Sequence, residues 1–132
     1  MYIEVVAAIL FFQNKVLAFQ RKASSDPVLS LKYEFPGGKI KKNEEQVDAL
    51  KRELREELSI NVKKLNFFYS NKFKYPKYEV KMYFYKSILM DLNFTLNVHE
   101  SYKLLSVNDL NTVSWLNADY PVIKLMKKKF SH

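Results

Sequence analysis

The stretch Gly38-Lys-Ile-Lys-Lys-Asn-Glu-Glu-Gln-Val-Asp-Ala-Leu-Lys-Arg-Glu-Leu-Arg-Glu-Glu-Leu-Ser-Ile60 gathers acidic residues in a chain that is otherwise strongly basic. It holds six of the 14 acidic residues and six of the 22 basic ones, so the rest of the chain carries 16 bases against 8 acids. A formal net charge of +8 favours anionic partners such as nucleotides, RNA or acidic lipids. The stretch is therefore either the solvated face of a helix or a cation site in a positively charged protein.

Length and composition are typical of one packed domain. The 132 residues are 48% hydrophobic and 15% aromatic, enough to build a single core. Cysteine is absent, which excludes disulfides and thiolate metal sites and suits a reducing cytoplasm. The N-terminus lacks the positive start of a signal peptide, and no apolar run approaches the ~20 residues that span a bilayer. We expect a single cytoplasmic domain over residues 1–132, with no membrane partner.

The apolar pattern predicts several strands before and after one long helix. Ile3–Phe12 is β-branched, aromatic and almost entirely apolar, which is typical of a strand buried on both faces. Gln13 and Asn14 supply a turn into a returning strand, Val16–Gln20. We expect the remaining elements to be strands at Tyr33–Phe35, Lys64–Tyr75, Glu79–Leu89 and Lys103–Val107, and a closing helix that starts at Asn117 or Asp119.

The quoted stretch itself predicts a helix from about Glu44 to Leu58. Asn43 is the expected N-cap, because Asn side chains accept hydrogen bonds from the free N–H groups of a first turn. One stripe at 3.6-residue spacing is apolar and forms the expected core face; its members are Val47, Leu50, Leu54 and Leu58.

Three carboxylates of this helix share one side. Glu53, Glu56 and Glu57 stand at i, i+3 and i+4, so their side chains are expected to converge beside the core face. Like charges at this spacing repel, and a hard divalent cation such as Mg²⁺ would offset the repulsion because it prefers carboxylate oxygens. Glu-rich helices with interspersed Arg are also common as solvated faces, so the spacing alone leaves both interpretations open.

The only two glycines of the chain, Gly37 and Gly38, directly precede the acidic helix. After Pro36 we expect them to end a strand in a flexible turn that exposes backbone N–H groups. Exposed N–H groups beside a cation site are suited to a polyphosphate. The glycines therefore favour the cation site over the solvated face.

These residues resemble the Nudix box, G-x5-E-x7-R-E-U-x-E-E-x-G-U, where U is aliphatic. The match rests on six of the seven fixed letters and on both aliphatic positions, namely Gly38, Glu44, Arg52, Glu53, Glu56 and Glu57 with Leu54 and Ile60. Ser59 departs from the pattern, since the family has its second glycine there. That glycine ends the helix in a left-handed conformation, so the departure affects helix termination rather than metal binding.

The resemblance extends over nearly the whole chain. Tyr33-Glu-Phe-Pro-Gly-Gly-Lys-Ile40 is similar to MutT-type nucleoside triphosphate pyrophosphohydrolases, and Arg52–Leu58 with Ile3–Ile9 looks closest to their bacterial CTP pyrophosphohydrolase branch. The resemblance implies the Nudix fold, an α/β (α+β) architecture with a mixed sheet between helices. Residues 38–60 would form its catalytic loop–helix–loop.

The resemblance also implies roles for the box residues. Glu53, Glu56 and Glu57 would be catalytic and would bind Mg²⁺ or Mn²⁺ together with Gly38. Glu100, a carboxylate on the loop before a late strand, would be a further metal ligand or the catalytic base. Arg52 would orient a box carboxylate through a salt bridge, and the remaining motif positions would be structural, namely Glu44 and Ser59. As a lone residue, Glu100 could equally be a solvated side chain.

The implied reaction converts a nucleoside triphosphate and water into a nucleoside monophosphate and pyrophosphate. Candidate substrate-binding residues are Arg21, Glu34, Gly37, Gly38, Lys39 and Asp119. Arg21 could instead be a surface residue. Asp119 could be an N-cap; as a carboxylate it would suit the amino group of cytosine, and when protonated the carbonyl of guanine or 8-oxoguanine.

The expected substrates are CTP, dCTP or oxidised dNTPs. The alternatives left open are an 8-oxo-dGTP diphosphatase, an RNA 5′-pyrophosphohydrolase and a nucleotide-binding module without turnover. No stable nucleic-acid complex is expected outside the RNA alternative, and monomer or homodimer stays open.

Overall fold

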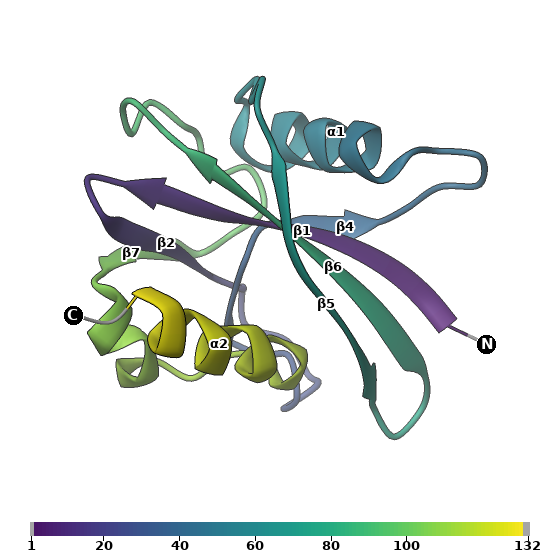
Figure 1. Ribbon diagram of the computed structural model, residues 1–132. Helices are drawn as coiled ribbons and strands as arrows, with labels where there is room; N and C mark the ends of the chain where they lie inside the picture. Colours follow the sequence, from purple (N-terminus) through teal and green to yellow (C-terminus); the bar gives the residue numbers. More distant parts are fainter. Residues whose placement is uncertain (1, 131–132) are drawn as a thin grey trace.

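A computed structural model describes residues 2–130 as a mixed β-sheet with a helix on each side (Figure 1). The elements in chain order are β1 (Tyr2–Phe12), β2 (Lys15–Gln20), β3 (Tyr33–Glu34), β4 (Gly37–Lys39), α1 (Gln46–Leu58), β5 (Asn66–Lys74), β6 (Glu79–Ile88), β7 (Ser101–Leu105), the 3₁₀ helices η1 (Val107–Thr112) and η2 (Asn117–Asp119), and α2 (Tyr120–Phe130). No helix among these residues is long and apolar enough to cross a membrane.

Strand β1 organises the sheet, whose main path runs β3-β2-β1-β6-β5. It pairs in parallel with β6 along most of its length, from Tyr2 opposite Glu79 to Phe11 opposite Ile88. It pairs antiparallel with β2 and with β4, while β7 extends the sheet from β2. The expected mixed sheet between helices is therefore confirmed.

The two faces of β1 belong to two separate cores. Val6, Ala8 and Leu10 pack on the α1 side, and the alternate residues Ala7 and Ile9 pack on the α2 side. This two-sided burial is why Ile3–Phe12 reads as a continuous apolar run. From α1, the buried members of the predicted stripe are Leu50, Leu54 and Leu58, each contributing about 2 kcal/mol of apolar burial.

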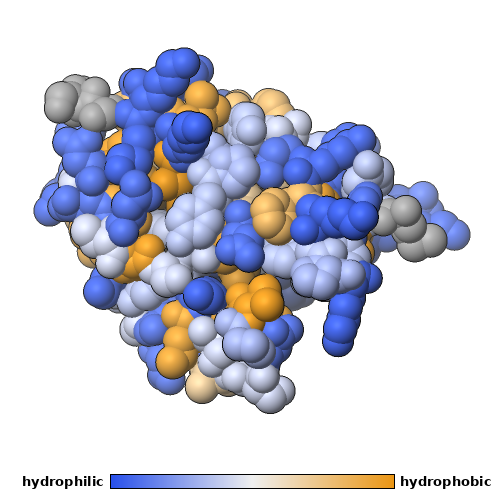
Figure 2. Space-filling view, turned by 90° about the horizontal axis from the view of Figure 1, so that it is seen from below, coloured by the Kyte–Doolittle hydropathy of each residue, from blue (hydrophilic) through white to orange (hydrophobic). Residues whose placement is uncertain are grey.

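Seen from the side that carries α2 in Figure 1, the surface is mostly hydrophilic, with small apolar patches between the polar side chains (Figure 2). Lysines at the end of α2, Lys127, Lys128 and Lys129, suit the negative end of the helix dipole. The basic composition is thus spread over the surface rather than buried.

The predicted start of the long helix was wrong. The helix begins at Gln46, not Glu44, and the N-cap position is Glu45, whose side chain makes no capping hydrogen bond. Asn43 instead adopts a left-handed conformation with φ of 63° in the preceding turn. Glu44 closes that turn by accepting the backbone N–H of Lys41 at 3.0 Å, so it lies outside the helix.

Further boundaries differ from the prediction: α2 begins at Tyr120 rather than at Asn117 or Asp119, β5 begins at Asn66 rather than Lys64, and two short strands differ as well. The last strand runs over Ser101–Leu105 rather than 103–107, and Val107 starts a 3₁₀ helix that the sequence did not indicate. Phe35 lies outside β3, where it packs against Trp115 with ring centroids 4.7 Å apart. Both differences arise because pairing with β2, not local apolarity, decides where these short strands stop.

Ser59 ends α1 in the left-handed conformation that the family's glycine would adopt, with φ of 57° and ψ of 38°. Asn97 compensates for the missing glycine: its side-chain amide donates to Ser59 Oγ and to the Glu56 carbonyl oxygen, both at 2.9 Å. The backbone N–H of Asn97 also donates to the Glu57 carbonyl oxygen. The connection between β6 and β7, which is distant in sequence, thus caps the C-terminal end of α1.

We therefore expect Ser59→Gly to unfold at a modestly higher temperature, by about 1–4 °C, because glycine removes left-handed strain but also the Asn97 contact. Hydrolysis of nucleoside triphosphates, the activity implied by the resemblance, should be unchanged. Asn97→Ala is the matched comparison and should lower the melting temperature. A Ser59→Gly protein that melts below wild type would contradict the strain argument.

Candidate active site

The two glycines lie in a strand, not in the flexible turn that was expected. Gly37 pairs with Ala7 and Gly38 with Val6 in β4, which runs antiparallel to β1. A Cβ atom on Gly37 would lie 2.0 Å from the Val6 carbonyl oxygen, and one on Gly38 would lie 2.5 Å from Glu53 Cδ. The glycines are therefore needed for close approach: one side of β4 meets β1, and the other meets the carboxylate of Glu53.

Glu57 is the most strongly perturbed carboxyl of the acidic helix. Its Oε1 accepts the Gly37 backbone N–H at 3.3 Å, and it shares a hydrogen bond with Glu53. Burial, followed by the negative charges of Glu34 and Glu53, raises the pKa of Glu57 to about 9. In the protein without a bound cation, this carboxyl therefore holds its proton at neutral pH.

Arg52 connects three carboxylates and the end of β4. Its Nε and Nη2 bond both carboxylate oxygens of Glu44, at 2.9 and 3.0 Å, and its Nη1 bonds Glu53 Oε1 at 2.9 Å. It also contacts Glu56 at 3.4 Å and donates to the Lys39 carbonyl oxygen at 3.1 Å. The hydrogen bond from Arg52 is the main reason why the pKa of Glu44 falls to about 2.

The spacing of the three box glutamates suggested that their side chains converge on one point, but in the structure they do not. Glu56 is largely exposed, with 55% of its side-chain surface accessible, whereas Glu53 and Glu57 turn toward β4. Within residues 2–130 no three acidic or histidine side chains form a ready-made metal cage. The physical reason is that Arg52 draws Glu53 and Glu56 to itself while Glu57 turns to Gly37.

A second group of charged residues, centred on Glu34, lies near Glu57. Glu34 bonds Arg21 Nη1 through one oxygen at 3.1 Å and His99 Nε2 through the other at 2.8 Å. His99 is only 4% exposed, and its Nδ1 has no hydrogen-bond partner among the described residues. Sequence reasoning did not select His99 as a site residue, because a single histidine carries no spacing signal; its only cue was its place next to Glu100.

Glu100, a predicted metal ligand, is exposed, and its side chain has no recorded partner in the described structure. Its backbone N–H donates to the Gln20 carbonyl oxygen at 2.8 Å, which fixes the chain just before β7. The neighbouring residue, His99, is the one that reaches the carboxylates. The structure thus brings Glu34, Glu53 and Glu57 together and leaves Glu100 at the surface.

Asp119 is not an N-cap; it is 2% exposed at the end of η2. The Phe35 backbone N–H donates to its carboxyl group, yet burial, and after it the charge of Glu34, raises the pKa of Asp119 well above its usual range. Beside it, the Tyr75 hydroxyl accepts the Ala118 backbone N–H at 3.0 Å. Asp119 thus lies buried near Glu34.

The glycine geometry predicts different outcomes for two alanine substitutions. Gly38→Ala should keep the fold, because the clash falls on a side chain that can move, but displacing Glu53 should lower nucleotide hydrolysis by about tenfold or more. Gly37→Ala meets backbone and should lower the melting temperature by about 10 °C or more. Circular dichroism melting and pyrophosphate release measure both; equal behaviour of the two variants would contradict the assignment.

The raised pKa of Glu57 predicts a pH dependence of stability in metal-free buffer. A carboxyl that binds its proton more tightly when folded stabilises the fold below its unfolded pKa of 4.5, and this contribution is lost as pH rises toward about 9. The melting temperature should therefore fall more between pH 5 and pH 9 in wild type than in Glu57→Gln. Glu56→Gln, at the exposed position, should keep the wild-type slope; parallel curves for wild type and Glu57→Gln would refute the shift.

With this geometry in view, sequence comparisons identify relatives. The family model described as the NUDIX domain matches residues 1–126. An 8-oxo-dGTP diphosphatase of Buchnera aphidicola is 55% identical over 53 residues, which are 40% of this chain and 43% of that protein. A CTP pyrophosphohydrolase of Escherichia coli is 53% identical over 58 residues, 44% of this chain and 42% of that protein. In both cases the chain matches less than two thirds of the relative's length.

Solved structures agree over more of the chain. The solution structure of the E. coli ORF135 protein superposes with a TM-score of 0.82 at 28% identity, covering 98% of this chain and 93% of that one. A MutT protein from Methanosarcina mazei superposes with a TM-score of 0.85 at 18% identity, covering 99% and 96%, and shows likeness of fold alone. Because the family model spans nearly the whole sequence, the chain belongs to the NUDIX domain family.

Proposed function

We propose that this protein is a divalent-metal-dependent nucleoside triphosphate pyrophosphohydrolase that releases a nucleoside monophosphate and pyrophosphate. The observation that carries the proposal is the crowding of Glu34, Glu53 and Glu57 at the glycine strand. Glu57 accepts one backbone N–H, and within residues 2–130 no cationic side chain is paired with it. Carboxylates crowded in this way repel one another, and a bound divalent cation would offset that repulsion.

The donor set fits Mg²⁺, with Mn²⁺ as a substitute. Glu53 and Glu57 offer oxygen ligands only, the class that hard cations prefer, and Glu56 lies on the next turn of α1. Gly38 has no side chain to come between Glu53 and β4. Glu53, Glu56 and Glu57 would hold the ion, which supplies charge neutralisation at phosphate oxygens and lowers the pKa of water.

The chain's own residues would position the reaction. Arg52 holds Glu44, Glu53 and the β4 carbonyl of Lys39 in one network, so it fixes the carboxylate that faces Gly38. When Glu57 loses its proton to become a ligand, its Gly37 hydrogen bond keeps it in place. Arg21, partly exposed beside Glu34, is available to a phosphate group.

Asp119 supports recognition of the base edge. Its raised pKa favours the protonated carboxyl, which presents one O–H donor and one acceptor. This pair matches the N3 and N4 groups of cytosine and also the O6 and N1 groups of guanine. CTP, dCTP and oxidised dNTPs are therefore the proposed substrates. The 8-oxo-dGTP alternative is favoured by the names of four of the five curated relatives that match.

The direct test is a panel of normal and oxidised NTPs and dNTPs with Mg²⁺, read by pyrophosphate release. Wild type should turn over at least one mononucleotide, and Glu57→Gln should lose at least about a hundredfold. Independently of activity, Mg²⁺ should raise the melting temperature of wild type but not of a Glu53→Gln/Glu57→Gln protein. No turnover by wild type on any member would refute the proposal; far faster hydrolysis of 5′-triphosphorylated RNA would shift it to the RNA alternative.

The same panel applied to Asp119→Leu addresses the base. Leu has no hydrogen-bonding group, whereas the protonated carboxyl presents one donor and one acceptor, so the ranking of substrates should change. A lowered melting temperature with an unchanged ranking would assign Asp119 to structure instead.

A further inference from the structure

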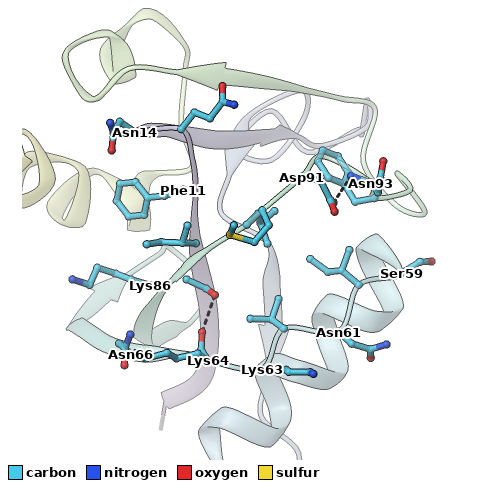
Figure 3. Close-up of a pocket in the computed structure, with 18 of the residues that line it drawn as sticks. Phe11, Asn14, Ser59, Asn61, Lys63, Lys64, Asn66, Lys86, Asp91 and Asn93 are labelled. Carbon is cyan, nitrogen blue, oxygen red and sulfur yellow. Dashed lines mark hydrogen bonds between the residues drawn. The ribbon is translucent and has the colours of Figure 1, made fainter.

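A groove of about 930 Å³ lies apart from the active site, where the segment after α1 meets the end of β6 and the β1–β2 turn (Figure 3). None of the box carboxylates lines it. Most of the residues around it that Figure 3 labels are polar. Its size is that of a small-molecule site.

Positive charge in this groove is not balanced by the protein. Lys63, Lys64 and Lys86 line it, and none of them forms an ion pair within residues 2–130. The one acidic residue of the lining, Asp91, uses a carboxylate oxygen to accept the Asn93 backbone N–H at 3.0 Å. The groove therefore attracts an anion.

The lining is also rich in side-chain amides. It holds five amide side chains, and none of these five makes a side-chain hydrogen bond within residues 2–130. They are Gln13, Asn14, Asn61, Asn66 and Asn93. Each amide offers two donors and one acceptor, the combination that pairs with the edges of nucleobases. Two of them, Gln13 and Asn14, form the turn between β1 and β2, and both have the positive φ that is typical of a two-residue hairpin turn.

Two apolar side chains at the edge of this groove are uncovered. Met90 is 88% exposed and Ile88 is 73% exposed, the two most accessible large apolar side chains recorded. Both line the groove. A flat heterocycle laid on them would be removed from water on one face while its edges stay within the ring of amides.

We propose that this groove is a second site that binds a nucleoside phosphate unit. Lys63 and Lys64 take the phosphate, Met90 and Ile88 support the base, and the amides contact its edges. The unit is either a free nucleotide or one residue of a single strand, because both present the same chemistry. An acidic peptide would satisfy the lysines as well, but it brings no planar base for the amides. The site uses no residue of the proposed catalytic machinery.

The test follows side-chain amide signals by NMR in EDTA, which keeps divalent cations out of the active site. The probes are CMP, GMP, pyrophosphate, cytidine, a five-nucleotide single strand and an Asp/Glu-rich peptide. CMP or GMP should saturably shift the amide signals of Asn61 and Asn66, and pyrophosphate should displace them. A much tighter single strand would identify the strand as the source of the unit; shifts with the peptide alone would overturn the proposal.

Two variants make the test specific. Lys63→Ala/Lys64→Ala should raise the dissociation constant of the nucleotide by about tenfold. Met90→Glu should abolish binding without lowering the melting temperature, because Met90 is exposed. Lys41→Ala/Lys42→Ala removes the same charge before α1 and should leave binding unchanged. Hydrolysis should persist in all three. An equal loss of nucleotide affinity in the two lysine-pair variants would show that the effect comes from net charge alone, and it would refute the site.

Discussion

The close approach of β4 to β1 on one side and to α1 on the other is the constraint on which the site depends. Gly37 and Gly38 permit it, since a Cβ at either position would collide with the Val6 carbonyl oxygen or the Glu53 carboxylate. Because β1 is also the parallel partner of β6 and packs into both cores, the glycine strand is fixed to a strand that is buried on both faces. The carboxylate edge of α1 is thereby held close to the backbone of β4.

Charge balance divides the carboxylates into two classes. Glu44 is neutralised by Arg52 and keeps a low pKa, whereas Glu57 is buried beside like charges and keeps a high one. Glu44 and Glu57 thus differ in pKa because of the charged groups that lie opposite them. The same helix serves as a structural element through its leucines and, in the proposed function, as a cation site through one edge.

The C-terminal end of α1 joins the active site to the second groove. Asn97 caps the helix through the Glu56 and Glu57 carbonyl oxygens, while the preceding residues Asn93 and Phe94 line the groove. One connection between β6 and β7 therefore supports both regions. It also explains how the chain tolerates Ser59. The Ser59 backbone N–H still donates to the Arg55 carbonyl oxygen, and the Asn97 amide adds hydrogen bonds to Ser59 Oγ and to the Glu56 carbonyl oxygen.

The sequence by itself determined α1, its leucine stripe, most strand positions and the identity of the box residues, because these depend on local periodicity and spacing. The β4 strand was missed, since three residues with two glycines carry no strand signal until β1 pairs with them. Only the tertiary structure decided that Glu34, Glu57, His99 and Asp119 share one neighbourhood while Glu100 stays outside. The reason is that burial and the charges across a packed interface set these carboxyl groups' pKa values, and neither can be read along the chain.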